Sequence, residues 1–114
     1  FGAIRNELSC NVRARSKTPE LTDAAKAEIA RVLDIWSASL DSEGGPFLLG
    51  DFSIADCMYM PVVTRFRTYG VALPESAQRY SAAIFEHPSV RALEALGRDA
   101  PAIAEYDASL LPVD

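Results

Sequence analysis

A helical repeat between Leu21 and Leu40 is the feature that most constrains the fold of this chain. Apolar residues recur there at steps of three and four, and charged residues occupy the opposite face. This spacing indicates an α-helix with one buried face, because a half-buried strand requires alternation at every second position. The apolar positions are Leu21, Ala25, Ile29, Val32, Leu33, Trp36 and Leu40. Thr18 followed by Pro19 predicts the N-cap and first turn, and the Gly-Gly-Pro sequence at 44–46 predicts the end.

The same spacing predicts helices at residues 53–69, 75–85 and 89–96. Residues 1–8 have the pattern of the end of a further helix, and the residues after 102 predict an extended tail. In the helix at 89–96 we expect three apolar residues to face inward: Val90, Leu93 and Leu96. No segment alternates convincingly with a period of two. We therefore expect an all-α bundle of about five helices, formed as a single domain over residues 1–114.

Composition and charge exclude several classes of function. With 11 basic against 16 acidic residues the net charge is −5, which argues against a nucleic-acid partner. The longest apolar run is far shorter than the roughly 20 residues of a membrane span, and the opening residues lack the charged leader of a secretion signal. Cys10 and Cys57 form no CxxC pair, which indicates free thiols in the cytoplasm. His87 has no ligand residues at suitable spacing, so we expect no metal site.

The apolar run from Phe47 to Pro61 contains one carboxylate, Asp56. Ser53 and Asp56 have the S-x-x-D spacing of a capping box, in which each side chain binds the other residue's backbone N–H group at the start of a helix. We interpret the pair as a structural capping box that begins a helix buried on most sides. The alternative is that Asp56 acts as a general acid or base. That role needs a second titrating group, and none is close in the sequence.

Three segments together resemble one known family. The segment FLLGDFSIADCMYMPVVTRF resembles the part of the glutathione S-transferase C-terminal domain in which a G-x-x-S/T-x-A-D box starts the central buried helix. The segment HPSVRAL resembles the His-Pro sequence that opens a later helix of that domain, and FGAIRNELSCNVRARSK is similar to the helix and turn of a bacterial branch. The resemblance covers essentially the whole chain and is strongest from Phe47 to Tyr69.

This resemblance implies that the complete enzyme has two domains. A thioredoxin-like domain at the N-terminus would hold glutathione and the residue that activates its thiol, and the helical domain would supply much of the electrophile pocket. The chain matches only the helical domain and lacks an initiator methionine. We expect an upstream domain to have been removed, or this domain to work without it. No catalytic serine, tyrosine or cysteine of the family is therefore assigned to a position here.

The resemblance also implies candidate substrate-binding residues. Phe1 and Arg5 lie one helical turn apart and are expected to face the cleft between the domains, or else to be a core and a surface residue. Arg65 and Tyr69 are also one turn apart, in the part of the helix that borders the electrophile pocket in several branches, or else form an ordinary surface pair. An arginine suits a carboxylate of glutathione or of an acidic substrate, and a tyrosine can stack or donate a hydrogen bond. Cys10 is expected to be a spare thiol, since the thiol that some relatives use lies in the other domain.

Two functions from different classes follow from the sequence. The first is the electrophile-binding and dimer-forming domain of a cytoplasmic glutathione S-transferase, an enzyme of detoxification that acts as a homodimer. In that case the isolated chain is inactive, because it lacks the residue that activates the thiol. The second is a non-catalytic helical interaction module, similar to those of translation-elongation and synthetase-associated assemblies. A large exposed apolar patch would favour the second function.

Overall fold

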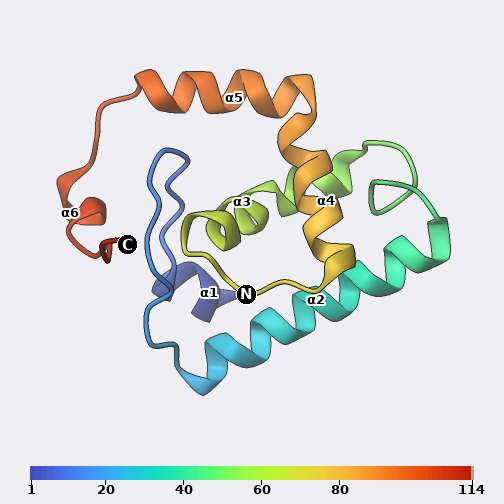
Figure 1. Ribbon diagram of the computed structural model, residues 1–114, viewed down its shortest axis with the longest axis horizontal. Coiled ribbons are helices and arrows are strands. Elements are labelled where there is room, and N and C mark those ends of the chain that lie inside the picture. Colours follow the sequence, from blue (N-terminus) through green and yellow to red (C-terminus); the bar gives the residue numbers. More distant parts are fainter. Residues whose placement is uncertain (114) are drawn as a thin grey trace.

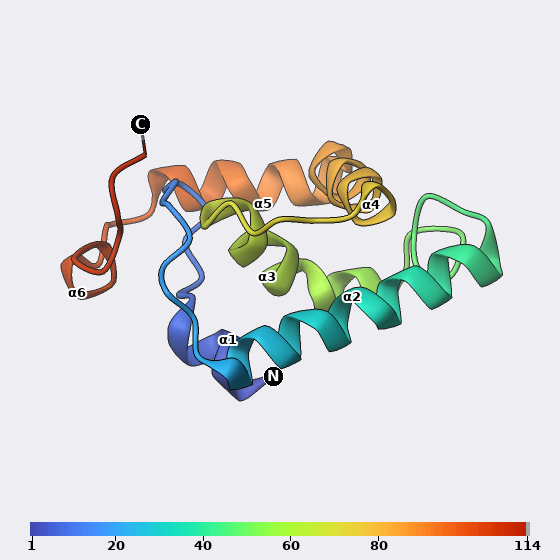
Figure 2. The same cartoon turned by 60° about the horizontal axis from the view of Figure 1, so that its bottom comes forward.

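The computed structural model describes residues 1–113, which form six helices and no strand. The helices are α1 (Gly2–Glu7), α2 (Asp23–Glu43), α3 (Ile54–Thr68), α4 (Glu75–Glu86), α5 (Pro88–Asp99) and α6 (Ala104–Asp107). Helix α3 lies in the middle, with the long α2 on one side and the pair α4 and α5 on the other (Figure 1). The same order is visible after rotation in Figure 2. The all-α fold predicted from the sequence is confirmed.

Trp36 lies at the centre of the core that these helices share. Its side chain is fully buried, and its ring contacts three other aromatic rings, two on α3 and one on α4. The ring centroids of Tyr59, Phe66 and Tyr80 lie 5.7, 5.6 and 5.0 Å from that of Trp36. Aromatic pairs at this separation and tilt stabilise a core beyond the area they bury, by about 0.5–1.5 kcal/mol each. The apolar stripe of α2 is therefore the surface on which α3 and α4 assemble.

The N-cap of helix α2 lies four residues after the N-cap predicted from the sequence. The N-cap is Thr22, whose hydroxyl accepts a hydrogen bond from the Ala25 N–H at 3.2 Å. Thr18 was the predicted cap, but its hydroxyl donates to the backbone carbonyl of Tyr69 and so ties the preceding loop to the end of α3. The prediction of the N-cap was wrong because this long-range contact uses the side chain. At the other end Gly44, with φ of 65°, caps the helix in the left-handed conformation.

A fully buried carboxylate joins three elements at the start of α3. Ser53 is the N-cap of a capping box, and its N–H donates to Asp56 Oδ2 at 2.9 Å. The other oxygen, Oδ1, accepts from the Leu48 N–H at 3.3 Å and from the Tyr80 hydroxyl at 2.8 Å. Burial and this bond to a carboxylate raise the pKa of Tyr80, which therefore remains a donor. Asp56 thus connects α3 to the turn before it and to α4.

Two surfaces that the sequence predicted to be buried are exposed. The first half of α3 is buried on one side only, because Ile54 and Met58 are 74% and 73% exposed. On α5 only Val90 is buried, while Leu93 and Leu96 are largely exposed. The inward face of α5 instead carries Glu94, which pairs with an arginine of α3, and Gly97, which packs against the loop after α1. The prediction from apolar spacing is therefore confirmed for Val90 and wrong for Leu93 and Leu96.

The segment after α5 is anchored, although the sequence predicted an extended tail. It contains the single turn of α6, and it passes beside the loop that follows α1 (Figure 1). Asn11 Nδ2 donates to Asp107 Oδ1 at 3.0 Å, and the Leu111 N–H donates to Ser16 Oγ at 2.8 Å. The end of the described chain is therefore fixed against the loop. In residues 1–113 no helix is long and apolar enough to span a membrane.

Helices α1 and α2 cap one another. Glu28 of α2 accepts hydrogen bonds from the backbone N–H groups of Ala3 and Ile4, at 3.1 and 2.8 Å, in the first turn of α1. In return Glu7 of α1 accepts from the N–H and the hydroxyl of Thr22, at 2.9 and 2.6 Å, at the start of α2. Six residues are too few for a helix that is stable alone. The cap from Glu28 therefore helps to order α1.

We expect Asp56→Ala to destabilise the domain severely, because buried donors on Ser53, Leu48 and Tyr80 would lose their acceptor. Each unsatisfied buried donor costs about 1–3 kcal/mol, so the melting temperature should fall by roughly 10 °C or more. Asp51→Ala removes an exposed carboxylate five residues away and should change the melting temperature little. Circular dichroism melts of both variants test this, and equal stability of wild type and Asp56→Ala would contradict it.

The cap on α1 should depend on pH. The hydrogen bond from the Ile4 N–H lowers the pKa of Glu28 below its ordinary value of 4.5. When the pKa of a carboxylate is lower in the folded than in the unfolded state, the carboxylate stabilises the fold at pH values above its unfolded-state pKa. This stabilisation is lost as the pH falls through the folded-state pKa. We therefore expect the protection factors of the Ala3 and Ile4 amides, which are the ratios of intrinsic to observed exchange rate, to decrease as the pH falls below about 4.5.

In Glu28→Gln we expect faster exchange at both amides already at neutral pH, because a neutral amide is a weaker acceptor. Glu20→Gln, at an exposed position outside the cap, is the matched control and should leave exchange unchanged. Identical protection in wild type and Glu28→Gln would show that the cap does not order α1.

Candidate functional site

Two adjoining hollows lie between α1, the loop after it, and the C-terminal segment. The first has a volume of about 220 Å³ and the second of about 180 Å³. Cys10 and Tyr106 line both, so the two hollows adjoin, and we refer to them together as the cleft. The first is lined by Arg5, Ser9, Cys10, Arg65 and Tyr106. The second adds Asn11, Val12, Arg13, Gly97, Ala100, Pro101, Ile103 and Asp107.

Arg65 is held in the cleft by backbone carbonyls of two helices. Its Nε donates to the Leu8 carbonyl at the end of α1, at 2.8 Å, and its Nη1 donates to the Pro61 carbonyl of α3 at 3.2 Å. A guanidinium has five N–H donors, so donors remain for a ligand. Because both acceptors are neutral, the positive charge of Arg65 is not cancelled by these bonds.

Arg5 provides the second positive charge of the cleft. It lies in the last turn of α1, is exposed, and makes no side-chain hydrogen bond or ion pair within residues 1–113. The structure thus brings Arg5 and Arg65, which are 60 residues apart in the sequence, to one hollow. The first hollow has no acidic residue among its lining residues.

Tyr69 and Phe1, the other two residues expected to bind substrate, do not line this cleft. Tyr69 is buried beneath it, and its hydroxyl shares a 2.7 Å hydrogen bond with Ser9 Oγ, which does line the cleft. Tyr69 is therefore placed to position Ser9. Phe1 is the N-cap of α1 and is half exposed outside the lining of either hollow.

The wall opposite α1 is built by a close approach of the loop to α5. Gly97 faces Val12, and a Cβ atom at this position would overlap the Val12 side chain. The C-terminal segment closes the second hollow with Ile103 and Tyr106, both about half exposed. The first hollow therefore carries the charges of Arg5 and Arg65, and the second carries Ile103 and Tyr106 together with the charged Arg13 and Asp107.

The side chains that line the cleft can bind an anionic ligand. Cys10 contributes an exposed free thiol, and the arginines contribute donors suited to a carboxylate. Asp56, weighed from the sequence as a possible acid or base, is fully buried with its oxygens engaged and lies outside the cleft lining. Among residues 1–113 no group of three His, Cys, Asp or Glu side chains is arranged to hold a metal ion.

Sequence reasoning did not single out Ser9 and Tyr106. Tyr106 lies in a segment expected to be an extended tail, and only its docking against the loop brings it to the cleft. Ser9 follows α1 directly, and its role depends on the position of Tyr69. No local pattern marks either residue, because both are brought to the cleft by contacts between distant segments.

A known family matches most of the chain. The family described as glutathione S-transferase, C-terminal domain, matches residues 19–106, which is most of the chain. No curated protein and no solved structure matches the chain significantly. The match includes the capped helix α3 and the corner between α4 and α5. The chain belongs to the glutathione S-transferase C-terminal domain family.

Proposed function

We propose that this chain is the helical domain of a glutathione transferase and binds the electrophilic substrate. The observation that carries the proposal is the hollow in which Arg5 and Arg65 meet, because no acidic residue of the described chain lines it. Family membership supports glutathione as the co-substrate, held mainly by a thioredoxin-like domain that precedes this one in the complete enzyme. Catalytic activation of the thiol belongs to that domain, so the chain alone is inactive.

The arrangement of the cleft supports a division of tasks. In the complete enzyme the glutathione thiolate attacks an electrophilic carbon of the substrate, or promotes a related isomerisation. Arg5 and Arg65 orient an acidic substituent of the substrate, or a carboxylate of glutathione, through charge-assisted hydrogen bonds. Ile103 and Tyr106 cover the apolar part of the substrate and exclude water. The complete enzyme works as a cytoplasmic homodimer in detoxification.

A second candidate function is favoured by the exposed apolar surface of α3 and α5. Ile54 and Met58 project from one face of α3, and Leu93 lines an apolar hollow of about 260 Å³ together with Cys57 and Met60. Apolar surface of this kind often marks an interface with another protein. A non-catalytic interaction module of the same fold would use it. The unpaired cationic cleft is the reason for preferring the enzyme, because such a module has no need of it.

Glutathione binding separates the two candidates. We expect the full-length product of the gene to be retained on immobilised glutathione, and free glutathione to raise its melting temperature, since a ligand that binds only the folded state stabilises it. We also expect a thioredoxin-like segment in the sequence encoded upstream of Phe1. No retention and no thermal shift would count against the enzyme and in favour of the interaction module.

The arginines should act on substrate binding more than on turnover. In the full-length enzyme we expect Arg5→Gln to raise KM for a carboxylated electrophile by roughly tenfold, with little change in kcat, because a charge-assisted bond is lost. Arg5 suits this test because it makes no contact that stabilises the fold within residues 1–113. Arg79→Gln, at an exposed i,i+4 ion pair far from the cleft, is the matched control.

A neutral electrophile provides the second control for Arg5→Gln. Its KM should be the same in wild type and variant, because it offers no carboxylate to Arg5. An equal rise in KM for both electrophiles would show that Arg5 supports the shape of the cleft rather than the charge of the substrate.

A further inference from the structure

A second group of arginines surrounds a hollow where the C-terminal half of α3 meets α5. This hollow has a volume of about 310 Å³ and is separate from the cleft of Arg5 and Arg65. It is lined by Arg67, Phe85, Arg91, Glu94 and Arg98. Three positive charges and one negative charge leave a net charge of +2 there, in a chain whose net charge is −5. The hollow is therefore a local concentration of positive charge on a protein whose net charge is negative.

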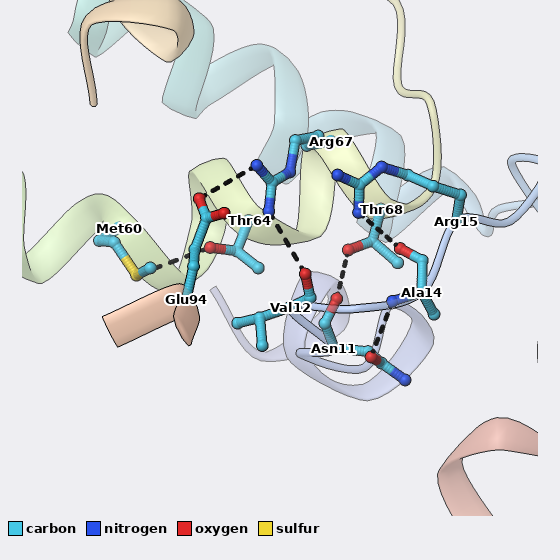
Figure 3. Close-up of polar contacts among 9 residues, drawn as sticks. All are labelled: Asn11, Val12, Ala14, Arg15, Met60, Thr64, Arg67, Thr68 and Glu94. Atoms are coloured by element: carbon cyan, nitrogen blue, oxygen red, sulfur yellow. Dashed lines mark hydrogen bonds and ion pairs between the residues drawn. The ribbon is translucent and has the colours of Figure 1, made fainter. Parts of the chain in front are cut away.

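Arg67 forms the rigid base of this hollow. Its Nη1 pairs with Glu94 Oε1 at 3.1 Å, and its Nη2 donates to the Val12 carbonyl at 3.4 Å (Figure 3). Its Cζ lies 3.6 Å from the centroid of the Phe85 ring. Both partners of the ion pair are largely buried, with 22% and 16% of their side chains exposed. These contacts fix the position of Arg67 and occupy the only carboxylate that lines the hollow.

Arg91 and Arg98 are left without a counter-charge. They lie seven residues apart on α5, with Glu94 between them, so all three share one face of the helix. Both side chains are exposed and make no hydrogen bond or ion pair within residues 1–113. Arg91 lies near the N-terminal end of α5, where the helix dipole disfavours a positive charge. The helix itself therefore gains nothing from Arg91.

A further arginine from the loop after α1 increases the positive charge. Arg15 lies beside Arg67 (Figure 3), and burial together with the charge of Arg67 lowers the pKa of Arg15. Four of the nine arginines in the sequence thus converge on this hollow. Their mutual repulsion would be relieved by an anion.

We propose that this hollow binds the phosphate group of a small soluble phosphate monoester. A monoester carries a charge of about −1.5 to −2 at neutral pH, which matches the net charge of the lining residues. The guanidinium fork fits two phosphate oxygens at once, so the exposed Arg91 and Arg98 are the ligands and Arg67 supplies fixed positive charge beneath them. The inference does not rest on glutathione chemistry, because it concerns a different hollow.

The test is a titration of the chain with inorganic phosphate and with glycerol 3-phosphate, followed by thermal shift and by NMR. We expect both to raise the melting temperature and to shift the signals of Arg67, Arg91 and Arg98, whereas sodium chloride at matched ionic strength does neither. The double variant Arg91→Gln/Arg98→Gln should bind at least about tenfold more weakly. The control Arg31→Gln/Arg79→Gln loses the same charge on exposed positions outside the hollow and should bind as the wild type does.

Three results would overturn the proposal. The first is an equal thermal shift from sodium chloride, which would indicate charge screening only. The second is an equal loss of binding in the two double variants, which would show an effect of net charge rather than of this hollow. The third is binding to phosphatidylcholine vesicles that contain phosphatidic acid, with no response to either soluble phosphate, which would assign the arginines to a lipid surface. Because the NMR signals report on the folded chain directly, a variant that fails to fold is recognised at once.

Discussion

The buried carboxylate of Asp56 is the interaction on which the rest of the domain depends. It accepts hydrogen bonds from the start of α3, from the turn before it through Leu48, and from α4 through Tyr80. A buried carboxylate is tolerated only when such donors surround it. In return it fixes where α3 begins and how α4 crosses it. Trp36 then packs against rings on both helices, so the core follows from the same three-element junction.

The other end of α3 is held by a different device, the loop between α1 and α2. Thr68 donates to the Asn11 carbonyl at 2.6 Å, and the Ser16 N–H donates to the Thr68 carbonyl at 2.7 Å. Figure 3 shows this loop lying along the last turns of α3. The loop separates two cationic regions, the cleft of Arg5 and Arg65 and the hollow of Arg67, Arg91 and Arg98. Both regions are therefore positioned by polar contacts to backbone rather than by apolar packing.

Positive charge is concentrated in these two regions although the chain as a whole is acidic. The overall charge of −5 excludes a broad basic surface, but it does not prevent arginines from gathering at two places. In the cleft, neutral carbonyls hold Arg65 and leave its charge available. In the hollow, Glu94 neutralises one arginine and leaves the others unpaired within residues 1–113. Whether each arginine is paired with a carboxylate, and not the net charge of the chain, decides where binding of an anion is favourable.

The sequence by itself determined the helices, the end of α2 and the capping box of α3, because these depend on spacing and on contacts within a few residues. The stripe of α2 and the S-x-x-D pattern are local in this sense. Only the tertiary structure decided that Thr22 caps α2, that Leu93 is exposed, and that Tyr106 meets Arg5 in one cleft. The physical reason is that each depends on a partner far along the chain. A local sequence pattern shows which residues are able to be buried or to cap a helix. Contacts with distant residues decide which of them are buried or cap a helix in the folded chain.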